Sequence, residues 1–158
     1  MRMRLVRAVS LSLLVGSLGA LPILPVSADH PGGGGRPFST TLIGAAERPG
    51  PGAPPPAIGS AELRLNPGQE EVCFELTVSG LTELGQTVSG AHIHRAGPNE
   101  PGPIVVPLTP PTTGASSGCV HADRALIKAI MKNPENYYVN VHAVPSFGPG
   151  ALRGQLSK

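Results

Sequence analysis

Strict alternation of apolar and polar residues in two neighbouring segments is the feature that most restricts the fold of this chain. Between residues 61 and 66, and again between 72 and 78, apolar residues stand at every second position. Successive side chains of a strand point to opposite faces, so this period of two predicts strands with one buried face. Pro67 and Gly68 form a turn between the two segments, which predicts an antiparallel hairpin.

Further short strands and one helix follow from the same kind of pattern. Asp123 can cap the helix, Asn133 and Pro134 end it, and its apolar stripe contains Ile127 and Ile130. With about eight short strands and many proline and glycine turns, the chain is predicted to be all-β. We expect a Greek-key-like β-sandwich or barrel with one short helix. The other predicted strands are residues 38–43, 88–94, 103–108, 118–120, 137–144 and 151–156.

The first 28 residues have the pattern of a signal peptide. Three arginines precede an apolar run that ends near Val26, and Val26-Ser27-Ala28 has the small residues of a cleavage site. Pro22 and Pro25 disfavour a membrane-spanning helix, although a retained N-terminal anchor is the alternative. We therefore predict a signal peptide (1–28), a flexible glycine-rich tether (29–37) and one β domain (38–158), with no transmembrane segment after cleavage. The protein is expected to be secreted or otherwise extracytoplasmic, in the periplasm or outside the cell.

The basic charge of the chain belongs largely to this leader. The formal net charge is +2, with 12 Lys and Arg against 10 Asp and Glu. Removal of the leader takes three arginines and no acid, so the net charge becomes about −1. No basic run remains, and nucleic-acid binding is therefore not expected.

Cys73 and Cys119 are the two cysteines of the chain. An even pair in an exported protein predicts one disulfide bond, with two buried free thiols as the alternative. The wide spacing does not resemble a redox or zinc CxxC motif. The bond is expected to stabilise a modest core, because aromatic residues make up 3% of the chain and tryptophan is absent.

Two predicted strands carry histidines that can converge. His92 and His94 share one face of their strand, and Asn140 and His142 share one face of another. If these strands lie together, three imidazoles meet, and neutral imidazoles are common ligands of zinc and copper. His92, His94 and His142 are therefore candidate Cu or Zn ligands. The alternative is that each histidine hydrogen-bonds its neighbours.

The same segments resemble the signature of the chordin-type (CHRD) domain family. The stretch 91–94, followed by Gly97 and by 102–108, is similar to the first half of that signature. The stretch 137–142 together with 153–156 is similar to the second half, so the resemblance covers roughly residues 38 to 156. It implies a β-rich extracellular module, with Cys73 and Cys119 placed as in bacterial secreted members. Its motif residues here are His92, His94, Asn140, His142 and Arg153.

Two departures from the family pattern affect the loops more than the histidines. A Glu-Val-Pro-Pro-like segment is usual near the first strand, and here it is Glu47-Arg48-Pro49, expanded by a Pro/Gly insertion. Ala143 stands where the family commonly has threonine. In animals such domains occur in chordin, an antagonist of bone morphogenetic proteins. That role is not carried over, because a shared fold does not establish a shared function.

Two functions remain open from the sequence. The first is a non-enzymatic binding or structural module whose ligand is an unknown protein or cell-surface component. Its support is that the sequence contains no recognisable nucleophile elbow, Ser/His/Asp order or paired acids of the kind that enzymes use. The second is a copper- or zinc-binding protein, with metal-dependent redox activity as its extension. The His-Ile-His strand is loosely similar to the copper strand of Cu/Zn superoxide dismutase, but no zinc loop is recognisable.

Purely structural roles compete with each of these assignments. His92 or His94 can bond backbone carbonyls at a sheet edge, and Asn140 can satisfy a neighbouring loop. Arg153 can fork onto a carbonyl or onto a carboxylate such as Glu75. His121 is expected at an exposed strand end and not in a metal site.

Overall fold

The computed structural model describes residues 34–158, and these contain eight strands and one α-helix. The predicted all-β fold with one short helix is confirmed. The predicted signal peptide and most of the tether lie outside the described residues. No helix within the described part is long and apolar enough to cross a membrane. The strands are β1 (Arg36–Ile43), β2 (Ile58–Asn66), β3 (Glu71–Ser79), β4 (Thr87–Arg95), β5 (Ile104–Leu108), β6 (Ala115–His121), β7 (Tyr137–Val144) and β8 (Phe147–Gln155).

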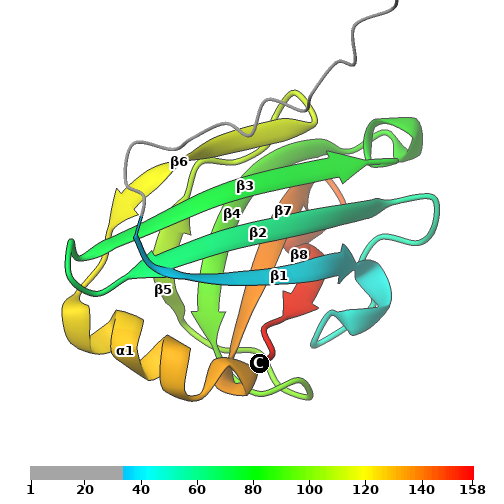
Figure 1. Cartoon of the computed structure of the whole chain (residues 1–158). Coiled ribbons are helices and arrows are strands. Elements are labelled where there is room, and N and C mark those ends of the chain that lie inside the picture. Colours follow the sequence, from blue (N-terminus) through cyan, green and yellow to red (C-terminus); the bar gives the residue numbers. More distant parts are fainter. Residues whose placement is uncertain (1–33) are drawn as a thin grey trace, which may run out of the picture. The chain divides into compact units, whose positions relative to one another are not determined.

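The eight strands form one antiparallel sheet in the order β5-β4-β7-β8-β1-β2-β3-β6. In Figure 1, β1, β2 and β3 run across the front while β4 and β7 cross behind them, so the sheet is rolled into a nearly closed barrel. The predicted hairpin is β2–β3, in which Leu63 lies opposite Phe74. Pairing of β4 with β7 and of β3 with β6 joins segments that are distant in the sequence.

The core lies inside the barrel and follows the predicted alternation. Along β2, the buried positions Ala61, Leu63 and Leu65 alternate with exposed Glu62 and Arg64. The helix α1 (Arg124–Lys132) begins where the side chain of Asp123 accepts hydrogen bonds from the backbone N–H groups of Ala125 and Leu126. It contributes two fully buried side chains to the same core, Ile127 and Ile130.

One part of the sheet is buried on both of its faces. In β7, residues Tyr137 to Val141 are all buried, whereas a strand with one solvated face would alternate. The apolar side chains of β7 face the barrel interior. Its outer face contacts the β4–β5 loop, residues 96–103, where Gly102 donates to the Tyr138 hydroxyl, and the β1–β2 loop, residues 44–57, where Glu47 accepts from Asn140. This second, polar layer contains the candidate site.

Several strand boundaries differ from the prediction. β1 begins at Arg36 and not at 38, and β6 is longer than residues 118–120. β8 begins at Phe147, four residues before the predicted start, and contains Pro149. A proline lacks the N–H that a central strand needs. The paired register of β8 with β1 is confined to Arg153 and Ile43, so at Pro149 the strand has no paired residue on its β1 side.

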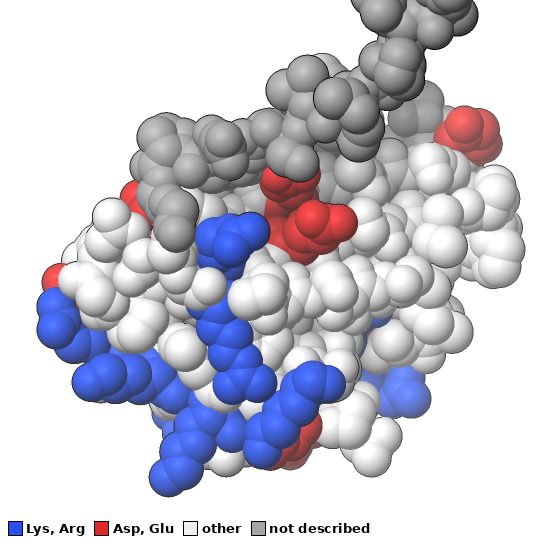
Figure 2. Space-filling view, viewed as in Figure 1, with Lys and Arg blue, Asp and Glu red and all other residues white. Residues whose placement is uncertain are grey.

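Basic side chains gather on one face although the sequence has no basic run. Figure 2 shows the Lys and Arg side chains concentrated over α1 and the neighbouring ends of β1 and β2. Arg36 reaches α1 by donating to the backbone oxygen of Met131 at 3.2 Å. The clustering could not be seen in the sequence, because three separate segments supply it. Its exposed members are Arg36, Arg64, Arg124, Lys128 and Lys132.

Candidate functional site

The three candidate metal ligands lie on the outer face of β4 and β7. The register places His92 opposite Asn140, His94 opposite Tyr138, and His142 opposite Gly90. His92 and His94 share one face because they are two residues apart, and pairing with β7 brings His142 alongside them. The polar layer therefore has its centre at His92.

The three imidazole rings converge. Their centroids are 5.6 Å apart for His92 and His94, 5.0 Å for His92 and His142, and 5.7 Å for His94 and His142. One ring nitrogen from each histidine lies within 4.8 Å of those from the other two. Two nitrogens bound to one Zn or Cu ion lie about 3–4 Å apart, since each bond is about 2 Å long. The ring nitrogens would need to approach one another by at most about 1–2 Å to share an ion.

Backbone carbonyls orient two of the rings. His94 Nδ1 lies 2.9 Å from the oxygen of Gly102, and His142 Nδ1 lies 2.9 Å from the oxygen of Gly148. A carbonyl oxygen can only accept, so Nδ1 carries the hydrogen in both rings and Nε2 keeps its lone pair. Both Nε2 atoms are buried without a hydrogen-bond partner. Histidines that bind metals have their second ring nitrogen held in this way.

In His92 the buried ring nitrogen without a hydrogen-bond partner is Nδ1 and not Nε2. Burial, followed by the nearby His142 and His94, lowers the pKa of His92 to about 4. Burial also lowers the pKa of His94, although the hydrogen bond to Gly102 opposes this. Both rings are therefore neutral near pH 7, which is the form that binds a metal ion.

A stack of side chains fixes the position of His94. Its ring lies parallel to that of Tyr138, with centroids 4.9 Å apart, and the guanidinium of Arg153 lies 3.5 Å from the centroid of the Tyr138 ring. The Tyr138 hydroxyl accepts a hydrogen bond from the backbone N–H of Gly102 at 3.2 Å. A Cβ at Gly102 would collide with the backbone oxygen of Arg95, so this close approach requires glycine.

Arg153 attaches the β4–β5 loop to the sheet. It is 1% exposed, and its guanidinium donates to the backbone oxygens of Gly97 at 2.6 Å and Glu100 at 3.0 Å. A third bond, at 3.0 Å, reaches the side-chain oxygen of Gln155. The predicted fork onto a backbone carbonyl is therefore observed. The loop that orients His94 through Gly102 depends on this arginine.

Glu47 belongs to the same layer, and sequence reasoning did not place it there. It is 3% exposed, and its two carboxylate oxygens accept from Asn140 Nδ2 at 2.8 and 2.9 Å. Burial raises the pKa of Glu47 to about 7, against the lowering effects of Asn140 and Arg153. Its position at the remodelled Glu-x-Pro segment was the one signal in the sequence. The contact itself joins residues 93 positions apart.

A family model for the CHRD domain matches residues 38–156. The chain belongs to the CHRD domain family. The match spans the sheet, the helix and every residue of the polar layer described above. No curated protein and no solved structure gives a significant match to the chain.

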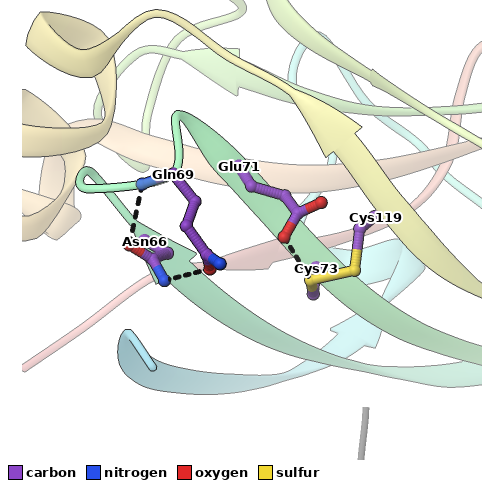
Figure 3. The surroundings of a disulfide bond; sticks show 5 residues. All are labelled: Asn66, Gln69, Glu71, Cys73 and Cys119. Carbon is purple, nitrogen blue, oxygen red and sulfur yellow. Dashed lines mark hydrogen bonds between the residues drawn. A yellow bond between two sulfur atoms is a disulfide. The ribbon is translucent and has the colours of Figure 1, made fainter. Parts of the chain in front are cut away.

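The CHRD domain has its predicted disulfide on the other part of the sheet. Cys73 and Cys119 face each other on β3 and β6 and are bonded at 2.03 Å. A Glu71 carboxylate oxygen lies 3.6 Å from the Cys73 sulfur (Figure 3). This is a contact and not a proton-sharing bond, because a disulfide sulfur has no hydrogen. Glu71, Cys73 and Cys119 lie close enough to hold an ion, but the bonded sulfurs have no thiolate to offer. His121 is exposed on β6, as predicted.

Glu47 should make the stability of the metal-free CHRD domain depend on pH. The folded pKa, about 7, lies above the model value of 4.5, so between these values the folded state keeps a proton that the unfolded state has lost. Stability from this group is therefore lost as pH rises from about 4.5 to 7. We expect the free energy of unfolding of Glu47→Gln to rise by roughly 2–3 kcal/mol relative to that of the wild type across this pH interval.

Urea unfolding of both proteins at a series of pH values measures this difference. Contributions of the histidines are common to both proteins and cancel in the comparison. Glu83→Gln, which removes an exposed glutamate, controls for the loss of one surface charge. A difference between Glu47→Gln and wild type that stays constant from pH 4.5 to 8 would contradict the assignment.

Proposed function

We propose that this protein is an exported, non-enzymatic CHRD module that binds one copper or zinc ion through His92, His94 and His142. The observation that carries the proposal is the convergence of three imidazoles, each of which has a buried ring nitrogen without a hydrogen-bond partner. Export is supported by the leader pattern and by the disulfide, since disulfides persist in oxidising compartments.

Unpaired polar atoms in the described residues are concentrated at this one place. Within residues 34–158, four buried side-chain nitrogens or oxygens lack a partner, and all four lie in the polar layer. An unpaired buried polar group costs about 1–3 kcal/mol, so folded proteins rarely keep several together without a ligand. A cation bound by three lone pairs would satisfy three of these atoms. They are His92 Nδ1, His94 Nε2, His142 Nε2 and Asn140 Oδ1.

The donor set favours copper or zinc over other common ions. Neutral imidazoles suit Zn and Cu, whereas Mg and Ca prefer carboxylate and carbonyl oxygens. The acid of this layer, Glu47, accepts hydrogen bonds from Asn140 through both of its carboxylate oxygens. When bound, such an ion would supply a Lewis-acid or redox centre. The residues of this chain would contribute binding and orientation, and the proposal includes no catalytic step.

Metal titration of the full chain tests the proposal. We expect the metal-free protein to take up about one equivalent of Cu²⁺ or Zn²⁺. The free energy of unfolding should also rise by about 2.7 kcal/mol when the free metal concentration is 100-fold above the dissociation constant. The variant His92→Ala/His94→Ala should lose this equivalent, because one imidazole cannot hold the ion. Elemental analysis after dialysis gives the stoichiometry.

The chain offers a matched control for the loss of two histidines. Its five histidines include His121, which is exposed on β6 outside the cluster, and His30, which precedes the described residues. The variant His30→Ala/His121→Ala should keep the full equivalent of metal. Equal copper and zinc contents in wild type and His92→Ala/His94→Ala would refute the metal site and leave the module with a different ligand.

A further inference from the structure

Asn140 is the fourth member of the unpaired set and has no role in the metal site as proposed. It is 2% exposed, lies directly opposite His92, and shares the outer face of β7 with His142. Its Nδ2 is engaged by Glu47, while its Oδ1 is buried without a partner. A buried amide oxygen in this state needs a donor.

The orientation of the amide follows from Glu47. Both carboxyl oxygens of Glu47 accept from Asn140 Nδ2, at 2.8 and 2.9 Å, so the amide turns its NH₂ group toward Glu47. The β1–β2 loop that carries Glu47 is attached to β8, where Ala53 donates to the backbone oxygen of Ala151 at 2.9 Å. Because β7 lies between β4 and β8, the NH₂ group points to the β8 side. Oδ1 is consequently turned toward β4 and His92.

A metal ion alone would not satisfy this oxygen. Amide oxygens suit Mg and Ca better than the copper or zinc that the imidazoles favour. Three protein ligands, however, leave a fourth position open on such an ion. A water molecule bound there has O–H groups to donate, and its oxygen would occupy the place between the ion and Asn140.

The surroundings of the histidines leave room for a ligand that exchanges. His94 is 7% exposed, but His92 and His142 are only partly buried. Gly90 borders both rings: a Cβ there would lie 3.2 Å from His92 Cε1 and 3.6 Å from His142 Cδ2. Since glycine has no side chain, nothing from this position covers the two partly exposed ligands.

We propose that the metal bound by the three histidines carries an exchangeable fourth ligand, a water molecule or another small ligand with a hydrogen to donate. Asn140 Oδ1 accepts that hydrogen bond, and Glu47 positions Asn140. This inference rests on the proposed metal site and extends it from a closed structural centre to one that small molecules can reach.

Azide binding to the copper-loaded full chain tests the inference. Azide can displace water from Cu²⁺, but it has no hydrogen for Asn140 Oδ1 and brings a negative charge to that oxygen. Wild type should therefore bind azide, and Asn140→Leu should bind it about tenfold more tightly, because water loses its acceptor. The azide-to-copper absorption band measures both affinities. Asn136→Leu, at an exposed asparagine four residues earlier, should match wild type.

A reciprocal exchange separates positioning from packing. In Glu47→Gln/Asn140→Asp, the new glutamine can donate to the new carboxylate, which keeps its second oxygen for the water. This variant should bind azide no more tightly than wild type, whereas a merely structural role for Asn140 predicts no such rescue.

Copper content is measured first on every variant, so the two proposals fail in different ways. If the wild type took up no equivalent of copper, both the metal site and this inference would be overturned. Copper bound at one equivalent with no azide band would show a closed site and overturn the inference alone. Equal azide affinity in wild type and Asn140→Leu would remove Asn140 from the fourth position.

Discussion

Replacement of Cys73 and Cys119 by alanine is expected to lower the free energy of unfolding by about 4 kcal/mol. The bond closes a loop of 46 residues, and in the chain-entropy model the unfolded state gains about that much freedom when such a loop opens. The effect should be large in proportion, because small domains are stable by only about 5–15 kcal/mol. The bond also fastens β6, the last strand of the sheet, to β3.

Urea unfolding with and without a thiol reductant measures the contribution of the disulfide. The wild type should lose stability when reduced, and reduced wild type should approach the Cys73→Ala/Cys119→Ala variant. Reductant should have no effect on the variant itself, which provides the control. An unchanged unfolding midpoint for the reduced wild type would contradict the stabilising role, as would a variant as stable as the oxidised protein.

The regular part of the sheet could be predicted because its physics is local. In β2 and β3 one face is buried and the other solvated, so the period of two is visible in the sequence. The helix could also be predicted, because the residues that cap and end it, Asp123, Asn133 and Pro134, are adjacent to it in the sequence. The predicted start of β8 was four residues too late. Pro149 is tolerated because the paired register of β8 with β1 is confined to Arg153 and does not reach the proline. How far that pairing extends depends on β1, which is distant in the sequence.

The candidate site could be predicted only in part, because it also depends on contacts between distant segments. A shared face for His92 and His94 follows from their spacing, but the place of His142 depends on pairing between β4 and β7, and this pairing contains a bulge between Val88 and Gly90. A one-residue change in register would send these side chains to the other face. The contact of Glu47 with Asn140 depends on how a proline-rich loop folds over the sheet. Nothing in the local sequence determines that.

Arg153→Met is expected to cost about 4 kcal/mol of stability and to weaken metal binding as well. Methionine fills a similar volume but leaves the backbone oxygens of Gly97 and Glu100 without their donor, and each charge-assisted bond is worth about 1.5–3 kcal/mol. Release of this loop also frees Gly102, which orients His94. Loss of such an outer partner typically reduces metal affinity about 10–100-fold. Chemical unfolding of the metal-free protein and competitive metal titration measure the two effects separately.

Two further variants show whether the loop couples Arg153 to the histidines. Arg153→Lys keeps the charge but cannot form the planar fork onto two carbonyls, so its losses should be smaller than those of Arg153→Met. Arg64→Met removes an exposed arginine from β2 and should leave both stability and metal affinity near wild type. If Arg153→Met lowered stability while its folded fraction bound metal with unchanged affinity, the β4–β5 loop would support the fold without orienting His94. The carbonyl of Gly102 would then be a passive neighbour of the site.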